Sequence, residues 1–554
     1  MNRKKVIYIL VSIVTLFAVL LGCFFFLFNE KKSPQKGSRL ISLVVNEQKL
    51  QFTSPGLTFE KIEEEKMNHT SYVDYKTTYD IVNRNQMTGT LHIVLRQIDN
   101  GDVWVFTRMN NHSKQTIDLE FNIPFENSNR YQFTDFDKIE VPHHDSEDVG
   151  YDPTTYPVGL IDLYQFEELR ASIIVGKNFV SKQLETAYQN GGKSFVRELI
   201  KENEEFQIKS NVNSIQLTAT LTSLGQDISE HWVLLSNAKL FKDHNQLMFW
   251  IERSNRKYRK TNAWYTEDGP YNKMVKTIEP LPESGLGYGR TLLLIQEEQA
   301  LIEYKKTKER YFYDLIINSF ANLETYKGEK NFWETEVTST WLKNLYGLHA
   351  PYIDTRFNEK TALFVKEAGE ILGIKGFEDA LLNYADLLVI QEKSDNVIWI
   401  DEGYLISDFF SLNEAKQTHA SLNHILGGLT ILLESYLETG DKKYLETALM
   451  IQKGIEELGV TWLKENGDTW YKYNTNHTFE GEDYRELTLK DLLITKKLWE
   501  KTGYRMSPIF DTLIRSKTNY LVEAQLPISK EVIDLLHNQE YTELIEGYPN
   551  IIKY

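Results

Sequence analysis

The sequence predicts an α+β multidomain protein with an N-terminal transmembrane helix, a β-sandwich or barrel-like region and a C-terminal α/α toroid-like helical domain. Three observations predict it: an uncharged apolar run near the N-terminus, strand-like alternation up to about residue 300, and helical periodicity from about residue 308. Hydrophobic residues make up 41% of the 554 residues, which is enough to bury a large core.

Residues 6–28 form the apolar run and carry no charged side chain. A helix needs about 20 apolar residues to cross a bilayer, so this segment predicts a signal anchor. Leu20-Leu21-Gly22-Cys23 also has the form of a lipoprotein processing box, although apolar residues continue after Cys23. We expect a cytoplasmic N-terminus over 1–5, a basic tether over 29–39, and a single-pass protein of the cell membrane with an extracytoplasmic body.

Residues 40–300 have the alternation and the turn residues of a β-rich region. The runs 90–95 and 103–106 flank Asp99-Asn100-Gly101, a sequence that favours a hairpin turn. Further short runs are rich in Val, Ile, Phe and Tyr and are separated by Asn, Asp and Gly. This pattern predicts a β-sandwich or a barrel-like module.

Residues 308–554 change to helical periodicity, with apolar residues three and four positions apart. Helices are expected over 310–323, 334–345, 359–372, 377–390, 418–437, 442–458, 484–501 and 509–522. Gly376, Gly440 and Gly503 are spaced by 64 and 63 residues, and each falls between two helical runs. Glycine suits the position after a helix and Asp441 suits the next N-cap, so the spacing predicts stacked helical hairpins.

The charge and the motifs exclude several classes of function. Lys and Arg number 62 against 79 Asp and Glu, a net charge of −17, which disfavours a nucleic-acid partner. A single Cys excludes a disulfide framework and Cys-rich metal sites. The chain has no HExxH, GxSxG or Walker sequence, and no cofactor is predicted.

The polar loop from His143 to Asp152 gathers histidines and carboxylates that can bind a metal ion. A solvated loop explains the same residues, because the segment is polar and precedes Pro153. We therefore predict no metal site.

A basic and aromatic segment, residues 253–265, contains five cations and three aromatic residues. Arg256, Arg259 and Trp264 are candidates to hold an anionic sugar chain, since cations pair with carboxylates or sulfates and rings stack on sugars. A basic loop that faces a membrane or a cell wall explains the same residues.

Polar and aromatic residues gather near helix ends in three stretches of the second half, 399–404, 418–424 and 467–473, the last followed by 483–485. Polar side chains that lead a buried helix are costly unless they are paired. These stretches are therefore expected to cap helices or to face a cleft.

These stretches resemble the C-terminal helical domain of the D-glucuronyl C5-epimerases, which act on heparan-type polysaccharides. The resemblance covers roughly residues 395–500, and more loosely 310–524. It rests on five features in the order of that family: Glu402-Gly403-Tyr404, Leu422-Asn423-His424, the helical hairpin around Gly440, Gly467-Asp468-Thr469-Trp470-Tyr471, and Asp483-Tyr484. It implies an anchored protein with β-rich modules and a helical catalytic domain, and a homodimer.

The resemblance implies that Tyr471, Tyr484 and Tyr404 are catalytic. Inverting C5 of a uronate removes a proton beside a carboxylate and returns one from the opposite face, so the developing enolate needs cations or hydrogen bonds. A tyrosine can exchange that proton only where its neighbours lower the cost of ionisation. Candidate substrate-binding residues are Glu402, Asn423, His424, Lys472, Arg485 and Arg356.

Three alternatives remain open at this point. The same carbanion can expel the 4-linked sugar, which is the reaction of a polysaccharide lyase. A toroid-type glycoside hydrolase needs two carboxylates, for which the candidates are Asp354, Glu359, Asp401 and Glu402. A non-catalytic surface protein can use its tyrosines only to stack on sugars. The partner expected from the epimerase resemblance is an anionic polysaccharide that contains uronic acid.

Overall fold

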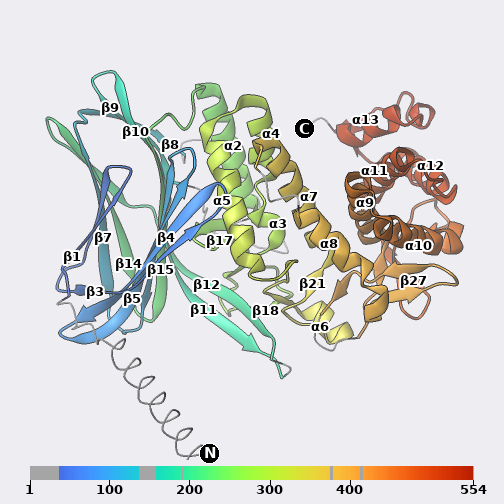
Figure 1. Ribbon diagram of the computed structural model, residues 1–554, viewed down its shortest axis with the longest axis horizontal. Helices are drawn as coiled ribbons and strands as arrows, with labels where there is room; N and C mark the ends of the chain where they lie inside the picture. The colour runs from blue at the N-terminus through green and yellow to red at the C-terminus, as the bar shows by residue number, and fades with distance from the viewer. Residues whose placement is uncertain are drawn as a thin grey trace, which may run out of the picture.

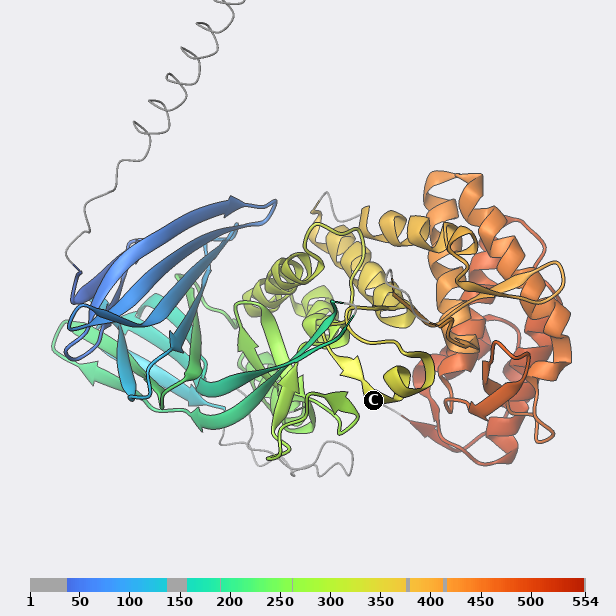
Figure 2. The same ribbon diagram turned by 90° about the horizontal axis from the view of Figure 1, so that it is seen from below.

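A computed structural model describes residues 37–136, 157–189, 191–261, 263–374, 379–411 and 416–552. The chain is a multi-sheet α+β protein in which most strands of the two large sheets gather at one end and helices α9 to α13 at the other (Figure 1). Helices α2, α4 and α5 lie between them in both views (Figures 1 and 2).

The smaller of the two large sheets is antiparallel, with the strand order β1-β2-β7-β14-β13. Every second residue of β14 is buried, as expected of a strand with one face on a core. The strands are β1 (Leu40–Val45), β2 (Gln48–Thr53), β7 (Ile117–Glu126), β13 (Phe206–Ser210) and β14 (Ser214–Ser223).

The larger sheet joins thirteen strands. Its β5 and β6 pair across the Asp99-Asn100-Gly101 turn, which confirms the predicted hairpin. The strands are β3 (Thr58–Asn68), β4 (Tyr72–Asn83), β5 (Gln86–Ile98), β6 (Val103–Asn111), β8 (Arg130–Asp135), β9 (Gly159–Gln165), β10 (Glu168–Val175), β11 (Asn178–Ala187), β12 (Lys193–Asn203), β15 (Asp227–Ser236), β16 (Ala263–Thr266), β17 (Gly269–Lys273) and β19 (Gly287–Gly289).

The larger sheet is buried on both faces. On one face Leu91 and Ile93 share a core with Phe52 of the smaller sheet. On the other face Trp104 and Trp232 belong to a second core, which continues into the helices. Side chains of a strand alternate between its faces, so one sheet contributes to both cores.

Helix α2 comes before the last three strands of the larger sheet, and the other helices follow that sheet in the chain. They are α2 (His244–Thr261), α3 (Leu292–Ile295), α4 (Glu298–Thr307), α5 (Arg310–Lys327), α6 (Thr340–Tyr346), α7 (Thr355–Leu372), α8 (Asp379–Val389), α9 (Leu422–Thr439), α10 (Lys442–Leu458), α11 (Leu487–Thr502), α12 (Ile509–Glu523) and α13 (Lys530–Asn538), with short 3₁₀ turns at Glu392–Ser394, Gly459–Trp462 and Thr542–Leu544.

Short strands connect these helices. They are β18 (Ile278–Glu279), β20 (Thr338–Ser339), β21 (Ile353–Asp354), β22 (Val397–Trp399), β23 (Tyr404–Ile406), β24 (Phe409–Phe410), β25 (Ala420–Ser421), β26 (Trp470–Tyr473), β27 (Phe479–Glu482), β28 (Ile528–Ser529) and β29 (Ile551–Ile552).

The predicted helix ends can be compared with their caps. Gly440 and Gly503 follow α9 and α11 in the left-handed conformation, and the Asp441 carboxylate caps α10 by accepting from Lys443 N, as predicted. The helix predicted over 334–345 is confirmed only in its second half, because α6 begins at Thr340. Gly376 lies outside the described residues.

The predicted fold class and location need a correction. In the ranges that the structure describes, no helix is long and apolar enough to cross a membrane. The predicted span over 6–28 lies outside those ranges. The fold class with a transmembrane helix, and the single-pass location at the cell membrane that depended on it, are therefore not supported by any described element.

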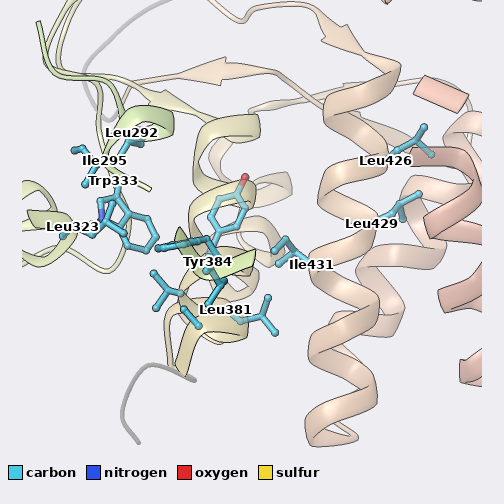
Figure 3. Close-up of a cluster of buried hydrophobic side chains, with 14 of the residues drawn as sticks. Leu292, Ile295, Leu323, Trp333, Leu381, Tyr384, Leu426, Leu429 and Ile431 are labelled. Carbon is cyan, nitrogen blue, oxygen red and sulfur yellow. Dashed lines mark hydrogen bonds between the residues drawn. The ribbon is translucent and has the colours of Figure 1, made fainter. Parts of the chain in front are cut away.

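The core between the helices fixes the start of α7. Trp333, Tyr384 of α8 and Leu426 of α9 all belong to it, although they come from separate segments (Figure 3). The Tyr384 hydroxyl donates to Thr355 O at 2.8 Å. This bond holds the first turn of α7, which carries several of the candidate site residues.

Candidate functional site

Tyr471 and Tyr484 come together at the small sheet β25-β26-β27, Tyr471 on β26 and Tyr484 just after β27. Tyr471 lies on β26 above Gly481, where an added Cβ would be 3.1 Å from Tyr471 Cβ, so glycine leaves room for the ring. The two rings pack edge to face, with centroids 5.8 Å apart and planes at 81°. Tyr484 is 49% exposed, so the pair reaches the surface.

A buried lysine fixes the backbone on both sides of this pair. Lys517 of α12 is fully buried and forms ion pairs with Asp468 and, at 2.8 Å, with Asp483. Asp483 also accepts from Thr488 Oγ1 at 2.8 Å. Asp468 precedes Tyr471 by three residues and Asp483 directly precedes Tyr484, so the lysine holds both tyrosine segments to α12.

A buried His–Asp pair lies behind Tyr471. The rings of His419 and Tyr471 are 6.1 Å apart between centroids. His419 Nε2 lies 3.2 Å from Asp408 Oδ2 and has no aligned hydrogen bond, whereas Nδ1 lies 2.9 Å from the hydroxyl of Tyr346. Ser421 fixes the carboxylate, through its N at 2.7 Å and its Oγ at 2.5 Å.

The charges of this cluster follow from burial and from its hydrogen bonds. Burial disfavours the Asp408 carboxylate, but His424, His419 and Ser421 outweigh it and lower the pKa of Asp408. Burial lowers the pKa of His424 to about 4, so this imidazole is neutral at pH 7. Burial, with Asp408 and Tyr484 adding to it, raises the pKa of the Tyr471 phenol well above its ordinary value.

Asp354 adds a second acid on the other side of the cluster. It caps α7 by accepting from Phe357 N at 3.0 Å. Burial, followed by the charge of Asp408, raises the pKa of Asp354 to about 7. The residue also lines a cavity of about 240 Å³ together with Arg290 and Tyr352. Asp354 is therefore an acid that can hold a proton at neutral pH.

Lys472 and Trp341 lie near the open side of the cluster. Trp341 is 40% exposed, and its ring contacts the His419 ring with centroids 5.6 Å apart. Lys472 Nζ lies 5.7 Å from the Trp341 ring centroid and 3.2 Å from Glu480 Oε2. Lys472 itself is buried and is paired with the largely exposed Glu480, so an anionic group from solvent can reach it only by displacing Glu480.

Arg356 and Asn423 lie one layer deeper. Arg356 pairs with Glu359 at 2.8 Å and with Asp491 at 2.9 Å, and donates to Asn423 O at 3.0 Å. These contacts connect α7, α9 and α11. His424, the next residue on α9, accepts from or donates to Thr355 Oγ1 at 2.7 Å and lies 3.8 Å from Asp408.

Tyr404 and Glu402 lie elsewhere. Tyr404 is 2% exposed, with its backbone against Gly454 of α10 and its ring 5.2 Å from the Trp399 ring. Burial raises its pKa to about 12. Glu402 projects from the exposed turn before Tyr404, near Lys453, so neither residue joins the Tyr471 pair.

The remaining predicted residues are also separate from the cluster. Arg485 is exposed and pairs with Glu486 at 3.2 Å. Trp264 is fully buried and stacks on Phe179, so protein atoms cover its faces. Arg256 and Arg259 belong to helix α2, not to a loop, and their side chains lie outside the described part of the chain.

Two further sequence proposals have different outcomes. The loop from His143 to Asp152 lies outside the described residues. Of the four carboxylates considered for a hydrolase, Asp401 and Glu402 lie in an exposed turn, and Glu359 forms an ion pair with Arg356. Asp354 is the one of the four that lines a described cavity.

Asp408, Tyr346 and Trp341 belong to the cluster but were not among the residues predicted from the sequence. Asp408 stands alone in the apolar run Leu405-Ile406-Ser407-Asp408-Phe409-Phe410, and a lone buried acid is a usable signal of a site. Tyr346 and Trp341 give no such signal, because aromatic residues at helical spacing usually pack in a core.

No family model and no curated protein matches the chain. The solved structures to which the chain is similar include three carbohydrate enzymes. A cellobiose 2-epimerase from Bacillus thermoamylovorans B4167 is 15% identical over 42% of this chain and 59% of its own, with a TM-score of 0.32. A family 76 glycoside hydrolase from a bovine Bacteroides thetaiotaomicron strain is 11% identical over 80% and 85%, with a TM-score of 0.36.

The third is a sugar epimerase from a ruminal bacterium, 16% identical over 47% of this chain and 67% of its own, with a TM-score of 0.33. The chain thus spans less than two thirds of the cellobiose 2-epimerase. TM-scores below 0.5 carry no argument about fold or activity, so the function has to be argued from the chain's own site.

Proposed function

We propose that the chain is a carbohydrate enzyme that acts at C5 of uronic-acid residues in an anionic polysaccharide, by removing and returning the C5 proton as a uronate C5-epimerase does. The observation that carries the proposal is the edge-to-face pair of the partly buried Tyr471 and the exposed Tyr484, with the His419 ring against Tyr471 and Asp408 beside His419. A proton-transfer site needs groups of this kind beside a path to solvent.

Tyr471 has the properties of a proton donor. Its raised pKa keeps the phenol protonated at neutral pH, so it can deliver a proton to a carbanion at C5. Lys472 can pair with the substrate carboxylate, on which the negative charge of the enolate develops. Tyr484, nearly half exposed, is suited to contact the sugar beside Tyr471.

Solvent exchange tests this proposal. The full chain is incubated in D₂O with hyaluronan, heparosan or a glucuronan, and deuterium at C5 is measured by NMR. We expect exchange with at least one polymer and a loss of about 100-fold or more in Tyr471→Phe and in Tyr484→Phe. Tyr504→Phe is the matched control, because Tyr504 is similarly exposed but remote from the cluster in the chain. Absence of C5 exchange, or full exchange in Tyr471→Phe, would contradict the proposal.

One observation favours a polysaccharide lyase as the second candidate. Rings in direct contact leave no room for a sugar between them, so Tyr471 and Tyr484 approach a substrate from one side. A group on one side can take the C5 proton and pass a proton to the leaving oxygen. Ultraviolet absorbance of a new C4–C5 double bond, with chain cleavage, would identify the lyase; exchange without cleavage would identify the epimerase.

A further inference from the structure

Epimerisation needs a second proton-transfer group besides the Tyr471 pair, on the other face of the sugar. Tyr346, on α6, is a second phenol in the same cluster, and its hydroxyl lies 2.9 Å from His419 Nδ1. The rings of Tyr346 and Tyr471 both pack on the His419 ring, with centroids at 5.8 Å and 6.1 Å from it. The two phenols are therefore separate groups on one shared imidazole.

We propose that Tyr346 is a catalytic base of this site and that the His419–Asp408 pair accepts its phenolic proton. This inference rests on the proposed function and adds a residue to it. An ionised Asp408 can only accept hydrogen bonds, so the relay places a proton of His419 on Nε2, which lies 3.2 Å from Asp408 Oδ2, although this N–H is not aligned on the carboxylate. Nδ1 then carries the lone pair and accepts the Tyr346 hydroxyl at 2.9 Å.

The proton balance is complete within the cluster. The Tyr346 oxygen takes the C5 proton as its own proton moves to His419 Nδ1, and the C5 electron pair becomes the enolate. His419 becomes an imidazolium paired with the Asp408 carboxylate. Tyr471 then gives its proton to C5, and solvent restores the starting protonation of the tyrosines and the imidazole. The relay is needed because burial, followed by Asp408 and Glu480, raises the pKa of Tyr346 and opposes its direct ionisation.

The titratable and charged groups described around this relay come from several elements. Asp408 and His424 lie on the Nε2 side of His419, and Tyr471 packs against its ring. Glu480 of β27 acts on Tyr346, and Lys472 pairs with Glu480. A negative charge near Tyr346 opposes formation of a free phenolate, which again favours a concerted transfer to His419.

A first test needs no substrate. The protein is labelled with ¹⁵N-histidine, and the His419 signals are assigned by their loss in His419→Gln. We expect the shifts of a neutral ring with a proton on Nε2 and a bare Nδ1 at pH 7. A proton on Nδ1, as the other neutral tautomer or as an imidazolium, would overturn the relay whatever the activity of the protein.

A second test separates catalysis from structure. Tyr346→Phe should lower C5 exchange by about 100-fold or more at pH 7. His419→Gln should also lower it, but the rate should recover only as pH rises above the range of a free phenol, about 10, because the pKa of Tyr346 is raised. A purely structural role for His419 would lower exchange equally at every pH, and that result would overturn the inference, as would wild-type exchange in Tyr346→Phe.

The two proposals fail in different ways. Wild-type exchange that persists in Tyr346→Phe but is lost in Tyr471→Phe removes Tyr346 from the mechanism and leaves the proposed function intact. Absence of C5 exchange in the wild type overturns both, even where the histidine shifts agree. Tyr504→Phe again serves as the control and should match the wild type in both measurements.

Discussion

At the scale of single residues, burial has the largest effect on the protonation states of the acids and bases in this site. Asp408 stays ionised because histidines and Ser421 surround it. Asp354, the N-cap residue of α7, lacks comparable partners and therefore keeps its proton to higher pH. Two carboxylates close together can hold opposite protonation states when their surroundings differ. The cluster can therefore contain an acid and a base at the same pH.

The pKa of Asp354 predicts a pH dependence of stability. Burial raises it from 3.8 to about 7, so between these values the folded protein holds a proton that the unfolded chain has lost. The free energy of unfolding that this bound proton contributes is fully present below about pH 4. It is lost as pH rises through 7, by about 1.4 kcal/mol for each pKa unit. Asp354→Asn, which keeps a capping oxygen, should therefore gain unfolding free energy relative to wild type at pH 8 but not at pH 4.

Urea unfolding of both proteins at pH 4 and pH 8 measures this effect. Asp441→Asn is the control, since Asp441 caps α10 in the same way but is exposed. Its difference from wild type should be the same at both pH values. An equal difference at both pH values for Asp354→Asn as well would show that Asp354 ionises normally in the folded state.

At the scale of elements, helical periodicity could be read from the sequence, but the small sheets at the site could not. The helix expected over 442–458 is α10 with its own cap, because its apolar spacing and Asp441 both lie in one local stretch. The helix expected from Thr418 begins only at Leu422, since Ala420 and Ser421 pair with β26, about 50 residues away. Such pairing depends on contacts distant in sequence, and it is what brings His419 to Tyr471.

The ion pairs of Lys517 with Asp468 and Asp483, which we call the Lys517 clamp, are the feature at this scale that most affects the site. Lys517→Met should leave Asp483 buried without its cation, and Asp468 with only the more distant Lys464 at 3.9 Å, at a cost of about 3–5 kcal/mol. Because both acids adjoin the tyrosine segments, C5 exchange should fall even in protein that remains folded. Urea unfolding and the exchange rate at a temperature where the variant is folded measure the two effects.

Lys530→Met is the control for the clamp. Lys530 also pairs with a carboxylate, Asp534 at 3.0 Å, but its side chain is 64% exposed. Surface pairs of this kind contribute little to stability, so this variant should unfold like the wild type. A loss of stability no larger in Lys517→Met than in Lys530→Met would show that the clamp is unimportant.

At the scale of the whole molecule, the β-rich and helical regions share one core. Trp104 of β6, Phe312 of α5 and Leu429 of α9 belong to the same buried cluster, which crosses the boundary expected between 300 and 308. Polar contacts cross it too: Arg310 of α5 pairs with Asp102 at 2.5 Å. The sequence marks where strands give way to helices, but it carries no local sign of how tightly the two regions pack, since that depends on contacts between distant residues.

Arg96 tests this coupling between the regions. It is buried on β5, pairs with Asp74 at 3.0 Å, and donates to Asn318 and Asn322 of α5 at 2.6 Å and 3.0 Å. Arg96→Met should leave Asp74 buried and unpaired and remove both contacts to α5, at about 3–5 kcal/mol. Calorimetry should show a lower melting temperature for the sheet and for the helices together, because the same residue holds both.

Arg130→Met, which breaks an exposed pair with Glu167, is the control and should melt like the wild type. Melting of the sheet alone in Arg96→Met, with the helical transition unmoved, would show that the two regions are stable independently of each other.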